Sequence, residues 1–456
     1  MQTPAHTDPR EIIATSAMGP LQVFVIGVTV ALNALDGFDV ASISFASPGI
    51  AAEWGIDRAS LGIVLSMELI GMAIGSVVLG GVADRIGRRP TMLGCLALMT
   101  VGMFMATTVT GLVDLSIWRV ITGLGIGGML AAITAVAAEF SNARRRHMSV
   151  SLMSIGYPIG AVAGGLVVAQ LLQGNDWRVI FYFGAAVTAA LIPVVYFGMP
   201  ESVHWLARKQ PAGALDRAND ALARMGHPRV TALPQVTMVQ GGRSVAGIFA
   251  PGLVAITALV TLAYFFHITT FYFIIKWVPK IVADMGFAAS SAANVLVWVN
   301  VGGATGGALF AILTQRFDVK PLTIGVLLLS TAAVTMFGRT PADLSQLALA
   351  CAVAGFCTNA GIVGLYAIIA KAFPTHVRAS GTGFAIGVGR GGAVIAPIIA
   401  GFLFTAGFTL PTVAMLMSVG SVFAAVMLLL LKLEPDRPAA ERTPVATPIP
   451  ATGRAQ

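Results

Sequence analysis

Apolar segments of about twenty residues, the length that crosses a bilayer as a helix, recur along the whole chain. Twelve occur, near residues 21–46, 60–82, 91–109, 112–139, 148–172, 178–199, 248–275, 288–312, 321–338, 343–370, 379–405 and 410–432. They fall into two sets of six. Because backbone polar groups in lipid must be satisfied within the segment, we predict an all-α polytopic membrane protein with twelve transmembrane helices.

The composition excludes an ordinary soluble domain, with 56% hydrophobic residues, 11% charged residues and a mean hydropathy of +0.84. The net charge of +8 is better explained by basic loops on one membrane face than by nucleic-acid binding. Cys95, Cys351 and Cys357 all lie in apolar segments and suit small reduced hydrophobes. Without a metal-ligand cluster or a nucleophile beside a base, we expect no cofactor, metal or enzyme activity.

The two sets divide the chain into a short N-terminal segment, a six-helix bundle, a polar linker, a second bundle and a tail. The predicted bounds are 1–20, 21–200, 201–246, 247–432 and 433–456. The loops on the linker's side hold sixteen Lys or Arg, and the opposite loops and span ends hold five: Arg58, Arg178, Lys276, Lys280 and Arg339. This asymmetry places the linker and both termini in the cytoplasm. The Pro-rich, Thr-rich tail should be disordered, and we expect a monomer.

An internal repeat relates the two bundles at an offset of 231 residues. The matches over about forty residues follow one order, as duplicated sequences do. They pair Pro48 with Pro279, Gly55 with Gly286, Ser60 with Ser291, Gly71 with Gly302, Gly75 with Gly306, Arg85 with Arg316, and Pro90 with Pro321. A duplicated six-helix unit is typical of secondary transporters, which build a site between two rocking halves.

Two aspartates, Asp36 and Asp39, lie inside the first apolar segment. A carboxylate at bilayer depth is costly and tends to serve an ion or substrate path. Three residues apart on a helix, the two side chains share one face, and their mutual repulsion favours keeping a proton on one of them. We therefore predict that this pair carries protons.

The loop after the second segment reads Gly80-Gly81-Val82-Ala83-Asp84-Arg85-Ile86-Gly87-Arg88-Arg89-Pro90. It resembles the Gly-x-x-x-Asp-Arg-x-Gly-Arg-Arg loop of the major facilitator superfamily. The resemblance implies a cytoplasmic gate between the halves, formed by Asp84, Arg85, Arg88 and Arg89 and joined by Glu139 and Arg378. The alternative is a topology signal alone. The second-half copy has lost the first acid and the glycine, which puts its own latch in doubt.

Two arginines are candidates for the substrate site. Arg390 lies deep in the eleventh segment, among glycines, where its guanidinium suits a carboxylate. The alternative is a structural ion pair with an acid such as Glu68. For Arg119, in the fourth segment, the alternative is snorkelling to the interface, whereas the family comparison implies a side chain that faces the central cavity.

Aromatic residues gather in the seventh segment, where His267 and Tyr272 are further candidates for the substrate site. An inward-facing ring such as Tyr272 would suit a planar substrate. A lone His267 is more often a hydrogen-bonded structural group than a proton carrier. Lys276 and Trp277, at the segment's end, fit an interfacial anchor.

The sequence resembles the aromatic acid:proton symporter branch of that superfamily. The similarity rests on Asp36-Gly37-Phe38-Asp39, on Thr375-His376-Val377-Arg378, on Ser380-Gly381-Thr382-Gly383 and on Gly389-Arg390-Gly391. It implies proton-coupled import of a small benzoate-like or hydroxybenzoate-like anion across a bacterial inner membrane, by alternating access. Two alternatives remain, a drug:proton antiporter of the same fold and a transporter-like ligand sensor. The interrupted Gly156-Tyr157-Pro158 sequence disfavours the first, and the short linker and tail disfavour the second.

Overall fold

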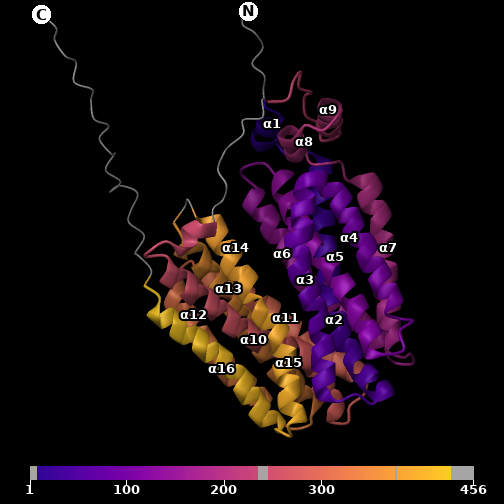
Figure 1. Ribbon diagram of the computed structural model, residues 1–456, viewed down its shortest axis with the longest axis vertical. Coiled ribbons are helices and arrows are strands. Elements are labelled where there is room, and N and C mark those ends of the chain that lie inside the picture. The colour runs from indigo at the N-terminus through magenta and orange to yellow at the C-terminus, as the bar shows by residue number, and fades with distance from the viewer. Residues whose placement is uncertain (1–7, 235–244, 375–376, 433–456) are drawn as a thin grey trace, which may run out of the picture.

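The computed structural model describes residues 8–234, 245–374 and 377–432. Helices account for almost all of this part of the chain (Figure 1). The N-terminal half holds α2 (Pro20–Trp54), α3 (Arg58–Ile86), α4 (Arg88–Met105), α5 (Leu112–Glu139), α6 (Arg146–Leu171) and α7 (Arg178–Gly198). The C-terminal half holds α10 (Val254–Asp284), α11 (Ala289–Leu313), α12 (Val319–Phe337), α13 (Leu344–Ala372), α14 (Arg378–Gly389), α15 (Gly391–Thr405) and α16 (Leu410–Leu430).

The predicted all-α membrane fold is confirmed, because eleven of the described helices are long and apolar enough to span a bilayer, counting α14 and α15 as one. The remaining predicted span is α4, whose first turn carries Arg88 and Arg89. It packs between α5 and α7 as a full member of the bundle. The eleventh span is divided into α14 and α15 at Arg390.

The internal repeat reappears as repeated helix packing. A side chain added at Gly71 of α3 would collide with the carbonyl oxygen of Val120 on α5, and one added at Gly302 of α11 would collide with that of Ala352 on α13. Gly75 and Gly306, one turn further along each helix, meet α5 and α13 in the same way. Small residues let helix backbones approach closely in a membrane, where no hydrophobic force drives association. Both halves therefore use one packing device at corresponding positions.

The short helices outside the spans gather at one end of the molecule, which we call the linker end (Figure 1). It carries α8 (Val203–Lys209) and α9 (Ala214–Arg224) of the linker and the short α1 (Pro9–Thr15), which packs on α8. A further turn, η1 (Val245–Phe249), precedes α10. The predicted tail and the residues Thr375 and His376 lie outside the described residues.

The two halves are joined toward the opposite end, which we call the far end (Figure 1). There Arg58 forms an ion pair of 2.9 Å with Asp284, and the backbone N–H of Ala59 donates to Thr405 Oγ1 at 2.9 Å. Gly62 of α3 lies against the carbonyl of Pro397 on α15. Near the linker end, no hydrogen bond or ion pair connects the halves among the described residues. This conformation is therefore closed at the far end.

Candidate functional site

Asp36 and Asp39 lie on consecutive turns of α2 and are almost completely buried, with exposed fractions of 2% and 0%. None of their four carboxylate oxygens has a hydrogen-bond partner among the described side chains and backbone. A buried carboxylate without hydrogen bonds is strongly disfavoured in its charged form. The pair lies within the first span, as predicted, and its role in carrying protons stays a prediction.

Directly beside the pair lies an ion pair that is fully enclosed. Glu68 of α3 and Arg119 of α5 both have an exposed fraction of 0%, and Glu68 Oε1 lies 2.6 Å from Arg119 Nη2. The same nitrogen donates to the carbonyl oxygen of Asp39 at 3.2 Å, and the guanidinium lies over the ring of Phe181. The alternative that Arg119 snorkels to the interface is therefore wrong. The other alternative, a pair between Glu68 and Arg390, is not observed.

The prediction that Lys276 anchors the membrane interface is wrong. Its Nζ donates to the carbonyl oxygen of Val40 at 2.6 Å and lies 3.5 Å from Glu68 Oε2, with no exposed surface. Lys276 and Trp277 were expected to anchor the interface, but both are completely buried because α10 continues to Asp284. Lys276 belongs to the C-terminal half, and its two partners belong to the N-terminal half.

These residues form a charge cluster, which we define as Asp36, Asp39, Glu68, Arg119 and Lys276. The cluster contains three acids and two bases, and all five are buried. Asp36 and Asp39 each lie within electrostatic reach of Glu68, and Asp39 also of Arg119. If every group were charged, a negative charge would be left uncompensated in the bundle interior, which is strongly unfavourable. The arrangement therefore favours one bound proton.

The two residues between the aspartates are packing residues. A side chain at Gly37 would lie 2.0 Å from the carbonyl oxygen of Tyr157, so only glycine allows α6 to approach α2 here. Phe38 fills the space left by Gly164 and Gly184 and meets the ring of Phe183 edge to face. The Asp-Gly-Phe-Asp sequence thus combines two acids with the contacts that fix their helix against α6 and α7.

Arg390 lies at the division between α14 and α15 and is half-buried. It has no acidic partner among the described residues. Its neighbours are instead the phenols of Tyr264, Tyr272 and Tyr366. The hydroxyls of Tyr264 and Tyr366 lie 3.1 Å apart. The guanidinium of Arg390 is therefore surrounded by phenols and remains able to bind an anion.

Tyr157 of α6 connects this region to the charge cluster. Its phenol is half-buried and lies within electrostatic reach of Asp36 and Glu68 on one side and of Tyr272 and Arg390 on the other. The acids of the N-terminal half and the arginine of the C-terminal half are therefore neighbours through one tyrosine. The sequence drew attention to Tyr157 only within Gly156-Tyr157-Pro158 and predicted no role for it in a site.

His267 is enclosed within the C-terminal half. Its Nε2 lies 2.8 Å from the carbonyl oxygen of Thr358, to which it donates, and its Nδ1 accepts from Ser421 Oγ at 2.9 Å. Both ring nitrogens are thus engaged, and the side chain has no exposed surface. This arrangement favours the structural interpretation of His267 over contact with a substrate.

Of the predicted gate residues, Asp84, Arg88 and Glu139 meet at the linker end, all within the N-terminal half. Asp84 lies 2.8 Å from Arg88 and 2.9 Å from Arg208, and Arg88 lies 3.1 Å from Glu139. Arg89 donates to the carbonyl of Tyr196, and Arg85 is exposed. Arg378 of the other half donates to its own Phe373 carbonyl at 3.2 Å. The expected association of Glu139 with Asp84 is present, through Arg88, while a latch between the halves stays a prediction.

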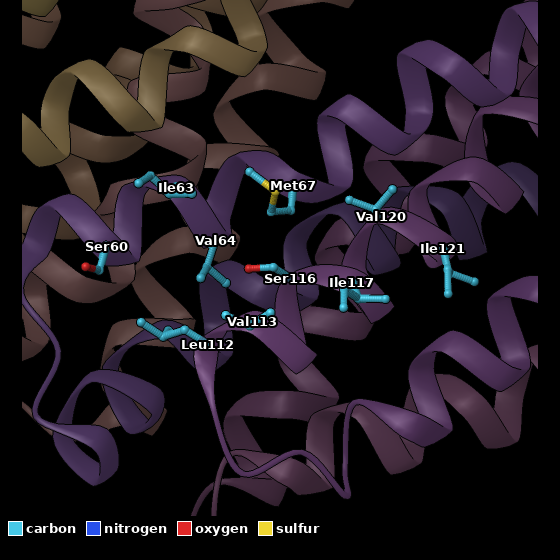
Figure 2. Close-up of a pocket in the computed structure, with 10 residues that line it drawn as sticks. All are labelled: Ser60, Ile63, Val64, Met67, Leu112, Val113, Ser116, Ile117, Val120 and Ile121. Atoms are coloured by element: carbon cyan, nitrogen blue, oxygen red, sulfur yellow. The ribbon is translucent and has the colours of Figure 1, made fainter.

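Two apolar hollows lie on the outside of the N-terminal half, away from these groups. One, of about 520 Å³, lies between α3 and α5 and is lined by residues such as Ile63, Val113 and Ile117, which are themselves exposed (Figure 2). The other lies between α3 and α4. Exposed apolar residues on a spanning bundle face lipid, so neither hollow suits a charged substrate.

Comparison with known proteins agrees with this architecture. The family model described as Major Facilitator Superfamily matches residues 29–268 and 260–453. A gallate transporter of Pseudomonas putida is 27% identical, over 93% of this chain and 95% of its own length. The 4-hydroxybenzoate transporter PcaK of Pseudomonas aeruginosa is 28% identical, over 92% and 95%. The 3-(3-hydroxy-phenyl)propionate transporter of Escherichia coli is 29% identical, over 84% and 88%.

Solved structures share the fold. The inward open conformation of the xylose transporter XylE from E. coli superposes with a TM-score of 0.71 at 18% identity, covering 91% of this chain and 96% of XylE. A bacterial homolog of the human lysosomal transporter Spinster, in an inward-facing conformation, gives a TM-score of 0.68 at 16% identity, covering 90% and 97%.

Proposed function

Because the chain belongs to the Major Facilitator Superfamily, whose members are transporters and not enzymes, we propose that it is a proton-coupled symporter importing an aromatic carboxylate. The proposed setting is a bacterial inner membrane, with the linker end in the cytoplasm, as the basic loops indicate. The proposed cargo is a benzoate or hydroxybenzoate, in line with relatives named as gallate and 4-hydroxybenzoate transporters.

The observation that carries this proposal is the unpaired Arg390 among phenols. A guanidinium binds a carboxylate through two parallel hydrogen bonds, and no acid of the described chain occupies it. Tyr272 and Tyr366 beside it offer ring faces and hydroxyls to a planar hydroxylated ring. Arg119 is held by Glu68 in this conformation, so we assign it to the coupling machinery in place of direct substrate contact.

Proton coupling is supported by the charge cluster, since three buried acids face two bases. We propose that a proton reaches Asp36 and Asp39 when the far end is open, and that the anion docks near Arg390. The halves then rock about the site, and both cargoes leave at the linker end. The gate residues around Asp84 and Arg88 would close the linker end in the opposite conformation.

The decisive test is uptake into proteoliposomes with an imposed pH gradient. A panel of labelled benzoates, hydroxybenzoates and phenylpropanoates is added outside at acidic pH. We expect concentrative uptake of at least one hydroxylated benzoate, and we expect an uncoupler to abolish it. Uptake that does not depend on the pH gradient would contradict proton coupling. Failure to take up any of the aromatic acids would contradict the proposed substrate class.

A further inference from the structure

We propose that Lys276 is a mobile counter-ion that occupies the acid cluster of the opposite half when the far end is closed and leaves it when the far end opens. The inference rests on the proposed alternating access and deepens the proposed proton coupling. It assigns to Lys276 the task of making proton binding and opening of the far end depend on each other.

The first step of the argument is the position of Lys276 across the boundary. Its ammonium group is bound to Val40 and Glu68 of the N-terminal half, while its backbone moves with α10. The neighbouring links between the halves, Arg58 with Asp284 and Ala59 with Thr405, lie at the same end. Rocking that separates α10 from α2 and α3 must therefore withdraw the ammonium from Glu68.

The second step is the charge that withdrawal leaves behind. The titratable groups near Glu68 and Lys276 come from four helices. They are Asp36 and Asp39 of α2, Arg119 of α5, Tyr157 of α6 and Tyr272 of α10, and Cys95 of α4 lies beyond Asp36. Once Lys276 leaves, Arg119 is the single base facing three acids. The excess of negative charge in the fully ionised site thus grows from one to two, which raises the affinity of the site for a second proton.

The two events are therefore linked thermodynamically. Binding of a proton to the acids weakens their hold on Lys276 and favours opening of the far end. When the far end closes and the linker end opens, the return of Lys276 expels this additional proton toward the linker end. Because linkage is reciprocal, the same free energy that couples opening to proton uptake couples closure to proton release.

The test measures opening of the far end by cysteine labelling, with no substrate present. Ala59 is buried at the contact with Thr405, so an Ala59→Cys variant reacts with a membrane-impermeant maleimide only when the far end opens. Rates are normalised to an Asn175→Cys variant in the exposed loop after α6, which removes the pH dependence of the thiol itself. In the Ala59→Cys parent, we expect normalised labelling to rise as the external pH is lowered.

Adding Lys276→Gln should raise the normalised rate by about tenfold, within the usual range for coupling between sites, and flatten its pH dependence. Glu68→Gln should do the same, whereas Lys276→Arg, which keeps the charge, should resemble the parent. The matched control is Lys280→Gln, one turn further along α10, where the lysine pairs with the partly exposed Asp284. Arg58→Gln, which removes an exposed pair, should have a smaller effect than Lys276→Gln.

Parent-like labelling of either Lys276→Gln or Glu68→Gln, with the parent's pH dependence, would overturn the proposal. If Lys276→Gln fails to reach the membrane, Glu68→Gln and Lys276→Arg decide the question. The labelling assay needs no substrate. If no aromatic acid is taken up, the proposed cargo is wrong, but the labelling result for Lys276 is unaffected. Conversely, proton-driven uptake with labelling unaffected by Lys276→Gln overturns the counter-ion alone.

Discussion

The guanidinium of Arg119 and the carboxylate of Glu68 lie 2.6 Å apart, and neither side chain has any exposed surface. They come from α5 and α3, whose glycines allow the two backbones to touch. The pair therefore depends on helix packing, and the packing depends on the pair, because neither charge tolerates this environment alone.

Removing one partner of this pair should be strongly destabilising. For Arg119→Met, which strands Glu68 with Lys276 alone, we expect a loss of about 3–5 kcal/mol in unfolding free energy. The measurement is the thermal unfolding midpoint of the purified protein in detergent. The control Arg178→Gln breaks a partly exposed pair with Glu53 and should cost about 1 kcal/mol or less. Additive losses in the Glu68→Gln/Arg119→Met double variant would show that the two residues do not act as a pair.

Neutralising either aspartate should uncouple transport from the proton gradient. We expect Asp36→Asn and Asp39→Asn to abolish concentrative uptake of a labelled hydroxybenzoate in proteoliposomes. Exchange of labelled for unlabelled hydroxybenzoate across the membrane, without a proton gradient, should persist. The control is Asp57→Asn, an exposed N-cap of α3 that asparagine can replace. Accumulation at the parent level in both span variants would exclude the pair as the proton carrier.

Arg390→Lys should weaken substrate binding without abolishing the fold. A lysine keeps the charge but cannot offer two parallel hydrogen bonds to a carboxylate, so we expect the half-saturation concentration to rise by about tenfold, equivalent to about 1.4 kcal/mol. Initial uptake rates across a substrate series provide the measurement. Arg339→Lys, in an exposed turn after α12, serves as the control. An unaltered half-saturation concentration would remove Arg390 from the site.

Gly37→Ala tests the contact between α2 and α6. The added carbon would lie 2.0 Å from the Tyr157 carbonyl oxygen, so α6 must move, at an expected cost of about 1–3 kcal/mol. Gly27→Ala in the same helix has no atom within 4 Å of the added carbon and should be neutral or slightly stabilising. Unfolding midpoints of the two variants give the comparison, and equal midpoints would contradict the assigned role of Gly37.

Stability should fall on acidification through His204 on α8. Burial lowers the pKa of this histidine below 6.5, so the folded state holds it neutral. The unfolded chain binds the proton more readily, and the stability due to neutral His204 is therefore present above about pH 6.5 and lost as the pH falls toward the folded-state pKa. His204→Gln should reduce the dependence of the thermal unfolding midpoint on pH in this window. His147→Gln, which replaces an exposed histidine, should leave the slope unchanged.

The sequence predicted the fold and the position of the two aspartates inside the first span because both depend on local patterns. Apolar length predicts spans, and an acid inside a span stands out from its neighbours. The partners of those acids depend on distant segments, so the pairing of Glu68 with Arg119 could not be predicted. Lys276 was misplaced for a related reason, since a span expected to end at residue 275 leaves it at the boundary, whereas α10 continues to Asp284. The position of Tyr157 between the acids and Arg390 likewise depends on distant segments.

The position of Lys276 also shows how far the two duplicated units have diverged. Under the 231 offset, the charged residues correspond to uncharged ones in the other unit: Asp36 to His267, Asp39 to Thr270, Glu68 to Val299, Arg119 to Ala350 and Lys276 to Phe45. The pseudo-symmetric image of the cluster is therefore empty of formal charge. Neither unit could be exchanged for a second copy of the other, because two N-terminal units would lack the lysine and two C-terminal units would lack every acid.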